Sequence, residues 1–187
     1  MDTEKRNRLC DLLRQLSLME GDFTLASGKQ SSFYIDGKRV TFHPEGLLLT
    51  VEAFMQAVGD LAYDAVGGPE MGAVPIAAAM AMRSAQVGRP VTAFFVRKAP
   101  KGHGTQKWIE GNLAPGGRAL ICEDVITSGG SVLKAIERVL EHGCKIAGIV
   151  ALVDREAGAV EQFAGMGYPY RPVFTLAEVT ANVNTGR

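Results

Sequence analysis

The chain has 187 residues, which is enough for a single domain with a small appendage. Its 20 basic residues balance its 20 acidic residues, so a general attraction to nucleic acid or to a membrane surface is excluded. No stretch is apolar and long enough to span a bilayer, and the charged segment after Met1 is not typical of a signal peptide. Three widely spaced cysteines form no metal-binding pattern, and we expect a cytoplasmic protein.

The first 45 residues predict a helix followed by antiparallel strands. Leucines at 9, 12, 13 and 16 follow helical spacing. Residues 21–40 are rich in β-type side chains, interrupted by Gly28 and Gly37, and predict one or two antiparallel strands. Pro44 then opens a second apolar stretch with helical spacing. We expect the part before residue 45 to cap the remainder of the chain and not to join its sheet.

After about residue 45 the pattern changes to apolar strands that alternate with helices. The apolar runs predict strands at 63–68, 91–96, 117–124 and 145–154. Helices are predicted at 72–85 and 131–143, with Gly143 ending the second. Strands that are apolar throughout indicate a parallel sheet covered on both faces. We therefore expect an α/β fold in one domain over 1–187, with its core at about 46–187 and a mainly parallel central sheet with helices on both faces.

Polar or glycine-rich turns follow the predicted strands. They lie at 67–72, 97–104, 123–131 and 154–158. In an open parallel sheet the carboxyl ends of the strands share one edge, and ligands bind in the crevice there. We expect these four turns to meet, although they are far apart in the sequence.

The turn at 123–131 joins two acids to a loop of hydroxyls and glycines that precedes a helix. Unpaired amides and the positive end of the helix dipole suit a phosphate, and glycines let it approach closely. Carboxylates suit sugar hydroxyls. This pattern predicts a ribose 5-phosphate, with Glu123 and Asp124 on the 2- and 3-hydroxyls and residues 127–131 on the phosphate. The alternative is a polar turn with a capping serine.

The stretch ALICEDVITSGGS (119–131) closely resembles the phosphoribosyl-diphosphate (PRPP) signature of type I phosphoribosyltransferases. The stretch RKAPKGHG (97–104), followed by IEG, is similar to the mobile loop of the orotate phosphoribosyltransferase family, and residues 23–40 resemble its N-terminal hood. The resemblance covers about 23–155. It implies the α/β fold of type I phosphoribosyltransferases, with a hood. It also implies transfer of the 5-phosphoribosyl group from PRPP to orotate, giving orotidine 5-monophosphate and diphosphate in pyrimidine biosynthesis.

The resemblance also implies roles for individual residues. It places Lys101, His103 and Asp124 in catalysis, and Thr127 and Arg155 at orotate, whose carboxylate suits an arginine. PRPP would be bound by a larger set from the basic loop and the signature: Arg97, Lys98, Lys101, His103, Glu123, Asp124, Val125, Ile126, Thr127, Ser128, Gly129, Gly130 and Ser131. The loop cations would neutralise the leaving diphosphate.

A cofactor and a partner are implied as well. Mg²⁺ is expected with the diphosphate, held mainly by substrate oxygens and water, so no protein metal site is predicted. In the family, the loop lysine and histidine reach the neighbouring subunit of a homodimer. By that resemblance Lys98, Lys101 and His103 act in the partner's site, and Arg97 lies at the base of the loop.

Several alternatives remain open from the sequence. The basic cluster at 97–104 can be a solvated loop. The stretch 67–77 resembles the family's diphosphate-binding loop, but it can also be a tight connection between a strand and a helix. Phe33 and Tyr34 can stack on the base or serve as core. His43 and His142 are expected to be structural, and Trp108 to anchor the far end of the basic loop.

One position departs from the family pattern. Ala26 stands where many orotate enzymes have a lysine, and Lys29 lies three residues later. Two rival functions remain. One is a transferase for another base, such as a purine; the other is a non-catalytic regulator that senses PRPP.

Overall fold

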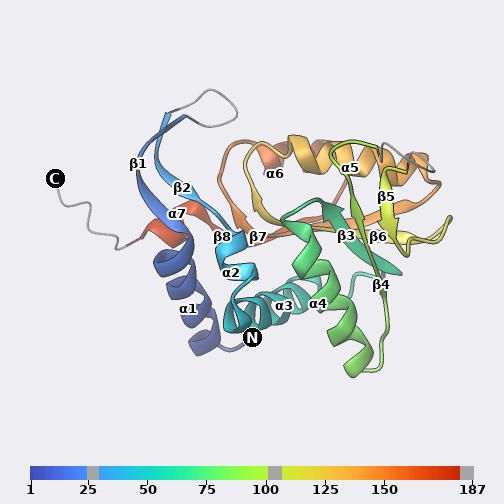
Figure 1. Cartoon of the computed structure of the whole chain (residues 1–187), viewed down its shortest axis with the longest axis horizontal. Helices are drawn as coiled ribbons and strands as arrows, with labels where there is room; N and C mark the ends of the chain where they lie inside the picture. Colours follow the sequence, from blue (N-terminus) through green and yellow to red (C-terminus); the bar gives the residue numbers. More distant parts are fainter. Residues whose placement is uncertain (25–29, 101–106, 182–187) are drawn as a thin grey trace.

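A computed structural model describes residues 1–24, 30–100 and 107–181 of the chain. Its centre is a six-stranded sheet in the order β5-β4-β3-β6-β7-β8 (Figure 1). Neighbouring strands are parallel, except that β5 runs antiparallel to β4. The strands are β3 (Ala65–Pro69), β4 (Thr92–Val96), β5 (Ile109–Gly111), β6 (Arg118–Ile126), β7 (Lys145–Asp154) and β8 (Tyr170–Thr175).

Helices cover both faces of this sheet, which confirms the predicted fold class (Figure 1). One face packs against α3 (Pro44–Val58) and α4 (Ala73–Gln86), and the other against α5 (Gly130–Glu141) and α6 (Ala159–Gly165). Side chains alternate between the two faces along a strand. On β6, Leu120 and Cys122 therefore join the cluster with α3 and α4, whereas Ala119 and Ile121 join the cluster with α5 and α6.

The N-terminal part forms its own small sheet, as predicted. Two strands pair antiparallel in it. Two helical segments precede them and one follows; the elements are α1 (Thr3–Leu12), the π-helical turn η1 (Leu13–Ser17), β1 (Leu18–Thr24), β2 (Gln30–Ile35) and α2 (Lys38–Thr41). We call residues 18–41 the hood. Its preceding helix is more than a cap, because Leu9, Leu12 and Leu13 are buried in the same cluster as α3.

The helix ends that the sequence marks are present. His43 caps α3 by accepting a hydrogen bond from Gly46 N at 3.3 Å, and Pro44 follows at the first helical position. Helix α5 ends at Glu141 with His142 as its C-cap residue, and Gly143 follows with a φ of 81°. Both histidines therefore have the structural roles expected of them.

The sequence pattern predicts none of the elements after Asp154, where α6, β8 and α7 (Leu176–Thr180) follow. These elements have five to seven residues, and β8 contains Pro172, so neither a helical nor a strand period can develop. Strand β5 was not predicted either, because three residues are too few for a period to develop. Among the helices of the described ranges, none has the length and hydrophobicity needed to cross a bilayer.

Candidate active site

The turns that follow the parallel strands lie at one edge of the sheet (Figure 1). The turn after β3 is joined to the turn after β4, because Lys98 N donates a hydrogen bond to Glu70 Oε1 at 2.8 Å. The turn after β7 is joined to the end of β6, because Arg155 N donates to Ile126 O at 2.8 Å. The turn after β3 also approaches the end of β6, because a Cβ atom on Gly72 would lie 2.2 Å from Asp124 Oδ1. The described parts of all four predicted turns therefore meet.

The loop at 127–131 leaves the N-terminus of α5 open to an anion. The N-cap residue is Gly129, whose φ of 84° is left-handed, and no side chain caps this 12-residue helix. Ser128, Gly130 and Ser131 are exposed. The alternative of a serine-capped turn is therefore wrong, and the helix amides and dipole face the open edge.

A buried aromatic ring lies directly against Gly129. A Cβ atom at this glycine would lie 2.7 Å from Cζ of Phe163, which is fully buried. Glycine is therefore required at this position both by the backbone conformation and by the space available.

The acid pair at the end of β6 lies between two close backbone segments. A Cβ atom on Gly72 would lie 2.2 Å from Asp124 Oδ1 and 2.3 Å from Glu123 Oε1, and one on Gly37 would lie 2.8 Å from Asp124 Oδ2. The two carboxyl groups therefore converge below the start of α4, where Gly72 is the N-cap residue. Both acids are nearly buried, at 6% and 7% exposure.

Burial and the neighbouring Asp124 raise the pKa of Glu123 well above its ordinary value. The Glu123 Oε1 atom accepts a hydrogen bond from Asp124 N at 3.1 Å, and Asp124 Oδ1 accepts one from Val125 N at 2.8 Å. These bonds fix the directions of both carboxyl groups. Hence Glu123 loses its proton less readily than a free acid, and both carboxyl groups are oriented before a ligand arrives.

Arg155 connects the hood to the sheet edge. Its guanidinium donates to Phe33 O at 2.9 Å and to Ser31 Oγ at 3.2 Å, and the residue is 8% exposed. Its Nε atom is buried and has no hydrogen-bond partner among the described residues. Burial lowers the pKa of this guanidinium from its usual value. A buried arginine with a free donor is suited to an anionic ligand group.

Of the two hood aromatics, Tyr34 lies outside the core at 39% exposure. Its ring is 5.6 Å from that of Phe23. This aromatic pair sits on the hood strands, and Tyr34 remains available to stack on a planar ligand. Ala26 and Lys29 lie outside the described residues.

Only the base of the basic loop falls within the described residues; Lys101 and His103 lie outside them. Arg97 N donates to Trp108 O at 2.8 Å, which closes the loop stem. A cavity of about 580 Å³ opens beside the loop stem. Charged and polar groups from the turn after β3, the turn after β4 and α5 line it, including Glu70, Arg97, Lys98, Ser131 and Lys134. The predicted phosphate loop and the basic loop thus share one cavity.

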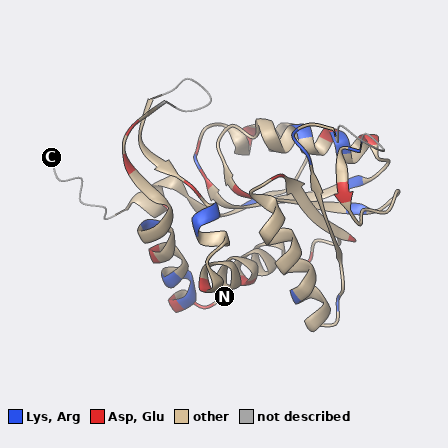
Figure 2. Cartoon of the chain, in the orientation of Figure 1, with Lys and Arg blue, Asp and Glu red and all other residues tan. Residues whose placement is uncertain are grey.

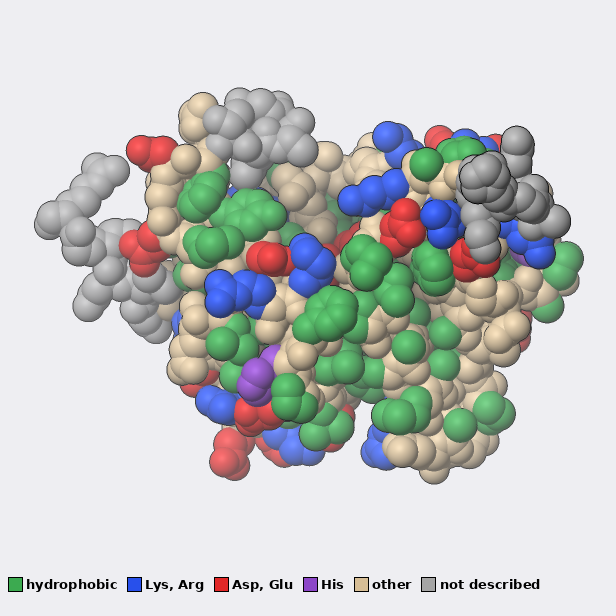
Figure 3. Space-filling model, viewed as in Figure 1, with side chains coloured by type: hydrophobic (Ala, Val, Ile, Leu, Met, Phe, Trp, Pro, Cys, Tyr) green, Lys and Arg blue, Asp and Glu red, His purple; other side chains and the backbone are tan. Residues whose placement is uncertain are grey.

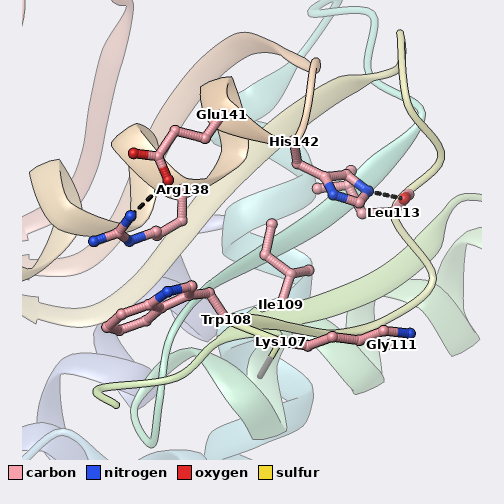
Figure 4. Close-up of a pocket in the computed structure, with 8 residues that line it drawn as sticks. All are labelled: Lys107, Trp108, Ile109, Gly111, Leu113, Arg138, Glu141 and His142. Carbon is pink, nitrogen blue, oxygen red and sulfur yellow. Dashed lines mark hydrogen bonds and ion pairs between the residues drawn. The ribbon is translucent and has the colours of Figure 1, made fainter. Parts of the chain in front are cut away.

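Trp108 anchors the far end of the loop stem, as predicted. The Arg138 guanidinium of α5 lies 4.2 Å from the centre of the indole ring and also binds Glu141 at 2.6 Å (Figure 4). Nearby, His142 Nε2 lies 3.0 Å from Leu113 O. The small cavity drawn in Figure 4, of about 460 Å³, shares Trp108 and Arg138 with the larger one.

Sequence reasoning placed the turn at 67–72 at this edge but missed the contacts that Gly37 and Gly72 make with the acid pair. It also missed Ser31, which binds Arg155, and Lys134, which lines the cavity. The glycines carried a usable signal, because a glycine next to a strand or helix end often marks a close backbone approach. Ser31 and Lys134 carried none, because their neighbours come from distant parts of the chain.

Comparison with known proteins supports the geometry. A family model described as phosphoribosyl transferase domain matches residues 45–165. The orotate phosphoribosyltransferase of Rhodopseudomonas palustris (strain BisB5) is 46% identical over 178 residues, which cover 92% of this chain and 95% of that protein. The one from Nostoc sp. (strain PCC 7120) is 41% identical over 175 residues, covering 93% and 84%.

Solved structures agree with these relatives. The crystal structure of the Mycobacterium tuberculosis H37Rv orotate phosphoribosyltransferase in complex with PRPP has a TM-score of 0.78 to this chain. Its sequence identity is 35%, and the match covers 94% of this chain and 98% of that one. The sequence signature, the sheet edge and these similarities lead to one conclusion: the chain belongs to the orotate phosphoribosyltransferase family.

Proposed function

We propose that this protein transfers the 5-phosphoribosyl group from PRPP to orotate at the sheet edge formed by 67–72, 97–104, 123–131 and 154–158. The observation that carries the proposal is the arrangement of three features around one edge. These are an uncapped helix N-terminus, a buried acid pair and a buried arginine with a free donor. They suit, in turn, a phosphate, a ribose and an anionic base.

The phosphate and the sugar would be bound by the end of β6 and the loop after it. The amides and hydroxyls of Thr127–Ser131 bind the 5-phosphate at the N-terminus of α5. Val125 and Ile126 supply backbone at the strand end, and Asp124, with Glu123 beside it, accepts hydrogen bonds from the ribose hydroxyls. Because these groups are fixed before PRPP binds, little reorganisation is needed at the reacting carbon.

Orotate would be bound on the hood side of the sugar. The Arg155 guanidinium binds its carboxylate or carbonyl oxygens, and Thr127 contributes its hydroxyl or amide. Tyr34 stacks on the ring from the hood. This arrangement presents a base nitrogen to the anomeric carbon.

In the reaction a bond forms between that nitrogen and the anomeric carbon, while the bond from this carbon to the diphosphate oxygen breaks. The diphosphate takes the electron pair, and positive charge develops on the sugar. Arg97, Lys98, Lys101 and His103 would balance the charge of the leaving group, together with the amides of the turn at 67–72. Asp124 stabilises the positive charge on the sugar.

The donor groups at this edge fit Mg²⁺ only in part. No group of three or more acidic, histidine or cysteine side chains suited to a metal occurs within residues 1–24, 30–100 and 107–181. Asp124 offers one carboxylate, so diphosphate oxygens and water would complete the shell, as Mg²⁺ prefers. When bound, the ion neutralises charge on the diphosphate.

One assay tests the proposed function. The purified protein is mixed with PRPP, Mg²⁺ and orotate, and loss of orotate absorbance is followed. A panel of bases tests the rival transferase, and turnover of adenine or guanine in place of orotate would favour it. Binding of DNA or RNA at physiological salt without any turnover would favour the regulator. The similarity to named orotate enzymes argues against both rivals.

We also propose a cytoplasmic homodimer. The three cysteines are buried and free, as suits a reducing compartment. Large apolar side chains gather on the face over α2, α3 and α4 (Figure 3), where Phe42, Leu48 and Met82 are 58–64% exposed and Met71 is 53% exposed. An exposed apolar surface of this kind fits a second copy of the chain.

Two measurements test the dimer. Phe42→Glu should shift the sedimentation coefficient toward a monomer, whereas Val160→Glu, at a half-exposed site on α6, should leave it unchanged. Mixing inactive Lys101→Ala and Asp124→Asn proteins should restore part of the activity, because a hybrid pair has one site with both native groups. Failure of this complementation would show that each site uses only its own loop.

A further inference from the structure

The loop stem, formed by Arg97, Lys98 and Trp108, ends on a strand whose own pairing holds it weakly. Strand β5 has three residues, lies at the edge of the sheet and pairs with β4, with Ile109 opposite Val96. Its residues are half-buried or exposed. An edge strand this short makes few ladder hydrogen bonds. The position of Trp108, which precedes β5, therefore depends on contacts outside the sheet.

These contacts come from one side of α5 (Figure 4). The Arg138 guanidinium lies 4.2 Å from the centre of the Trp108 ring, and one turn later His142 Nε2 lies 3.0 Å from Leu113 O. Residues four positions apart lie on the same side of a helix. Arg138 and His142 therefore hold the two ends of the segment 108–113. The N-terminus of the same helix is the proposed phosphate site.

Trp108 in turn fixes the start of the basic loop. Its carbonyl oxygen accepts a hydrogen bond from Arg97 N at 2.8 Å, while Lys98 N donates to Glu70 Oε1 at 2.8 Å. Neither Arg97 nor Lys98 forms a salt bridge within residues 1–24, 30–100 and 107–181. Figure 2 shows basic residues on the loop stem and on α5 beside it, and Trp108 and Arg138 line the same cavity as these two cations. Both charges are therefore available to an anion in that cavity.

We propose that Arg138 is a positioning residue for the leaving diphosphate: by stacking on Trp108 it holds the loop stem, and with it Arg97 and Lys98, at the cavity where the diphosphate leaves. This inference rests on the proposed function, because it names a residue that serves the same leaving group. A cation over an indole ring is stabilising because the face of the ring is negative. Without this contact the stem would occupy its working position less often, and the apparent affinity for diphosphate would fall by that fraction.

Two features make the stack testable apart from the rest of α5. The ion pair that Arg138 forms with Glu141 at 2.6 Å can be removed separately, and the Glu141 side chain is 61% exposed. An exposed pair three residues apart on a helix contributes little to stability. Trp108 is the only tryptophan in the sequence, so tryptophan fluorescence reports on the stack directly.

The experiment compares variants of the intact protein that each lose one partner. Arg138→Met removes the cation, Trp108→Leu removes the ring, and Trp108→Phe keeps an aromatic face. Glu141→Gln is the matched control, because it removes the ion pair and leaves the stack. Isothermal titration uses two probes, diphosphate with Mg²⁺ for the loop stem and ribose 5-phosphate for the phosphate loop. Acrylamide quenching measures the exposure of the Trp108 ring, and thermal unfolding checks the fold.

We expect Arg138→Met to weaken diphosphate binding about fivefold, the factor that corresponds to one cation–π contact of a half-buried pair. Affinity for ribose 5-phosphate should change by less than about twofold, because its loop lies at the other end of α5 and shares no contact with the stack. The value of kcat/KM for PRPP should fall by the same factor as the diphosphate affinity. Acrylamide quenching should rise in Arg138→Met and stay at the native level in Glu141→Gln.

A double variant tests whether the two residues act through one contact. In the Trp108→Leu background the ring is already absent, so adding Arg138→Met should weaken diphosphate binding by less than about twofold further. Trp108→Phe should weaken it less than Trp108→Leu does, because an aromatic face remains for the cation. Two independent losses that multiply in the double variant would overturn the inference, because each residue would then act without the other.

The remaining outcomes separate this inference from the proposed function. Native diphosphate affinity in Arg138→Met would overturn the inference alone, and so would an equal loss of diphosphate and ribose 5-phosphate affinity. Equal weakening in Glu141→Gln would also overturn it, because the effect would then belong to the ion pair. A native protein that binds diphosphate but does not consume orotate would reject the proposed function, while the titration would still test Arg138. A native protein that binds neither PRPP nor diphosphate would reject both.

Discussion

The tight contact between Gly72 and the acid pair gives a sharp test of the site. Gly72 has φ −59° and ψ −43°, so alanine has no backbone strain there. Its new Cβ atom would instead lie 2.2 Å from Asp124 Oδ1 and 2.3 Å from Glu123 Oε1, more than 1 Å inside an ordinary contact. Both carboxyl groups must turn away, and Glu123 Oε1 loses its hydrogen bond from Asp124 N.

The expected loss of stability is moderate. Two displaced side chains cost about 1 kcal/mol each, and the lost hydrogen bond adds about 1 kcal/mol. A total of about 3 kcal/mol lowers Tm by roughly 6–12 °C in a domain of this size. The protein should remain folded, because the free energy of unfolding of a domain is roughly 5–15 kcal/mol.

The loss of activity should be larger than the loss of stability suggests. Misplacing a catalytic group by about 1 Å can lower the rate about a hundredfold, so kcat/KM for PRPP in Gly72→Ala should fall by that factor. Gly130→Ala is the matched control for stability, because nothing lies within 4 Å of its Cβ position and alanine favours a helix start. Its Tm should be unchanged or slightly higher.

A double-mutant cycle tests whether the stability cost of Gly72→Ala comes from its contact with the carboxyl groups. Glu123→Ala removes one of the two clashing groups, so the stability cost of Gly72→Ala should shrink by about 1 kcal/mol in the double variant. Strict additivity of the two changes would refute the contact, and so would a Gly72→Ala protein with native Tm and native kcat/KM.

Three further predictions concern single charged groups. Lys101→Ala should lower kcat far more than it changes Tm, because the lysine acts on the leaving diphosphate; unchanged kinetics would remove that role. Arg155→Lys should raise KM for orotate at least tenfold with little change in KM for PRPP, because lysine lacks the planar donor pair; equal effects on both substrates would contradict its placement at the base. Glu123→Gln should be more stable than the native protein at pH 8, with the difference vanishing below about pH 4.5, because a raised folded pKa destabilises only the ionised form; a Tm difference that does not depend on pH would refute it.

Elements whose pattern repeats were predictable from the sequence, and elements that depend on distant partners were not. Strands β3, β4, β6 and β7 are continuous apolar runs, and α3 and α5 show one apolar stripe, so local periodicity was enough. Strand β8 has no such period. It exists because β7 offers it an open edge, with Phe174 opposite Val153. An edge strand of this kind is specified by its neighbour more than by its own residues.

The candidate site also has features that the sequence predicts and features that it does not. The turns after the strands were predictable because parallel topology places them at one edge whatever their side chains are. The burial of Glu123 and Asp124 was not, because it arises from Gly37 and Gly72, which come from the hood and from the turn before α4. The sequence shows two acids, but only the fold shows that they share one confined space, in which burial raises the pKa of Glu123.

The buried layer below the site joins its phosphate end to its base end. Gly129 rests on Phe163, and the Phe163 ring packs edge-on against Tyr170 at 5.1 Å. Burial, with Asp154 nearby, raises the pKa of the Tyr170 hydroxyl. Asp154 precedes Arg155 and holds the chain there by accepting from Glu156 N at 2.8 Å. Packed interiors transmit displacements. A smaller side chain at position 163 should therefore disturb the phosphate loop more than Arg155, and PRPP affinity should fall more than orotate affinity.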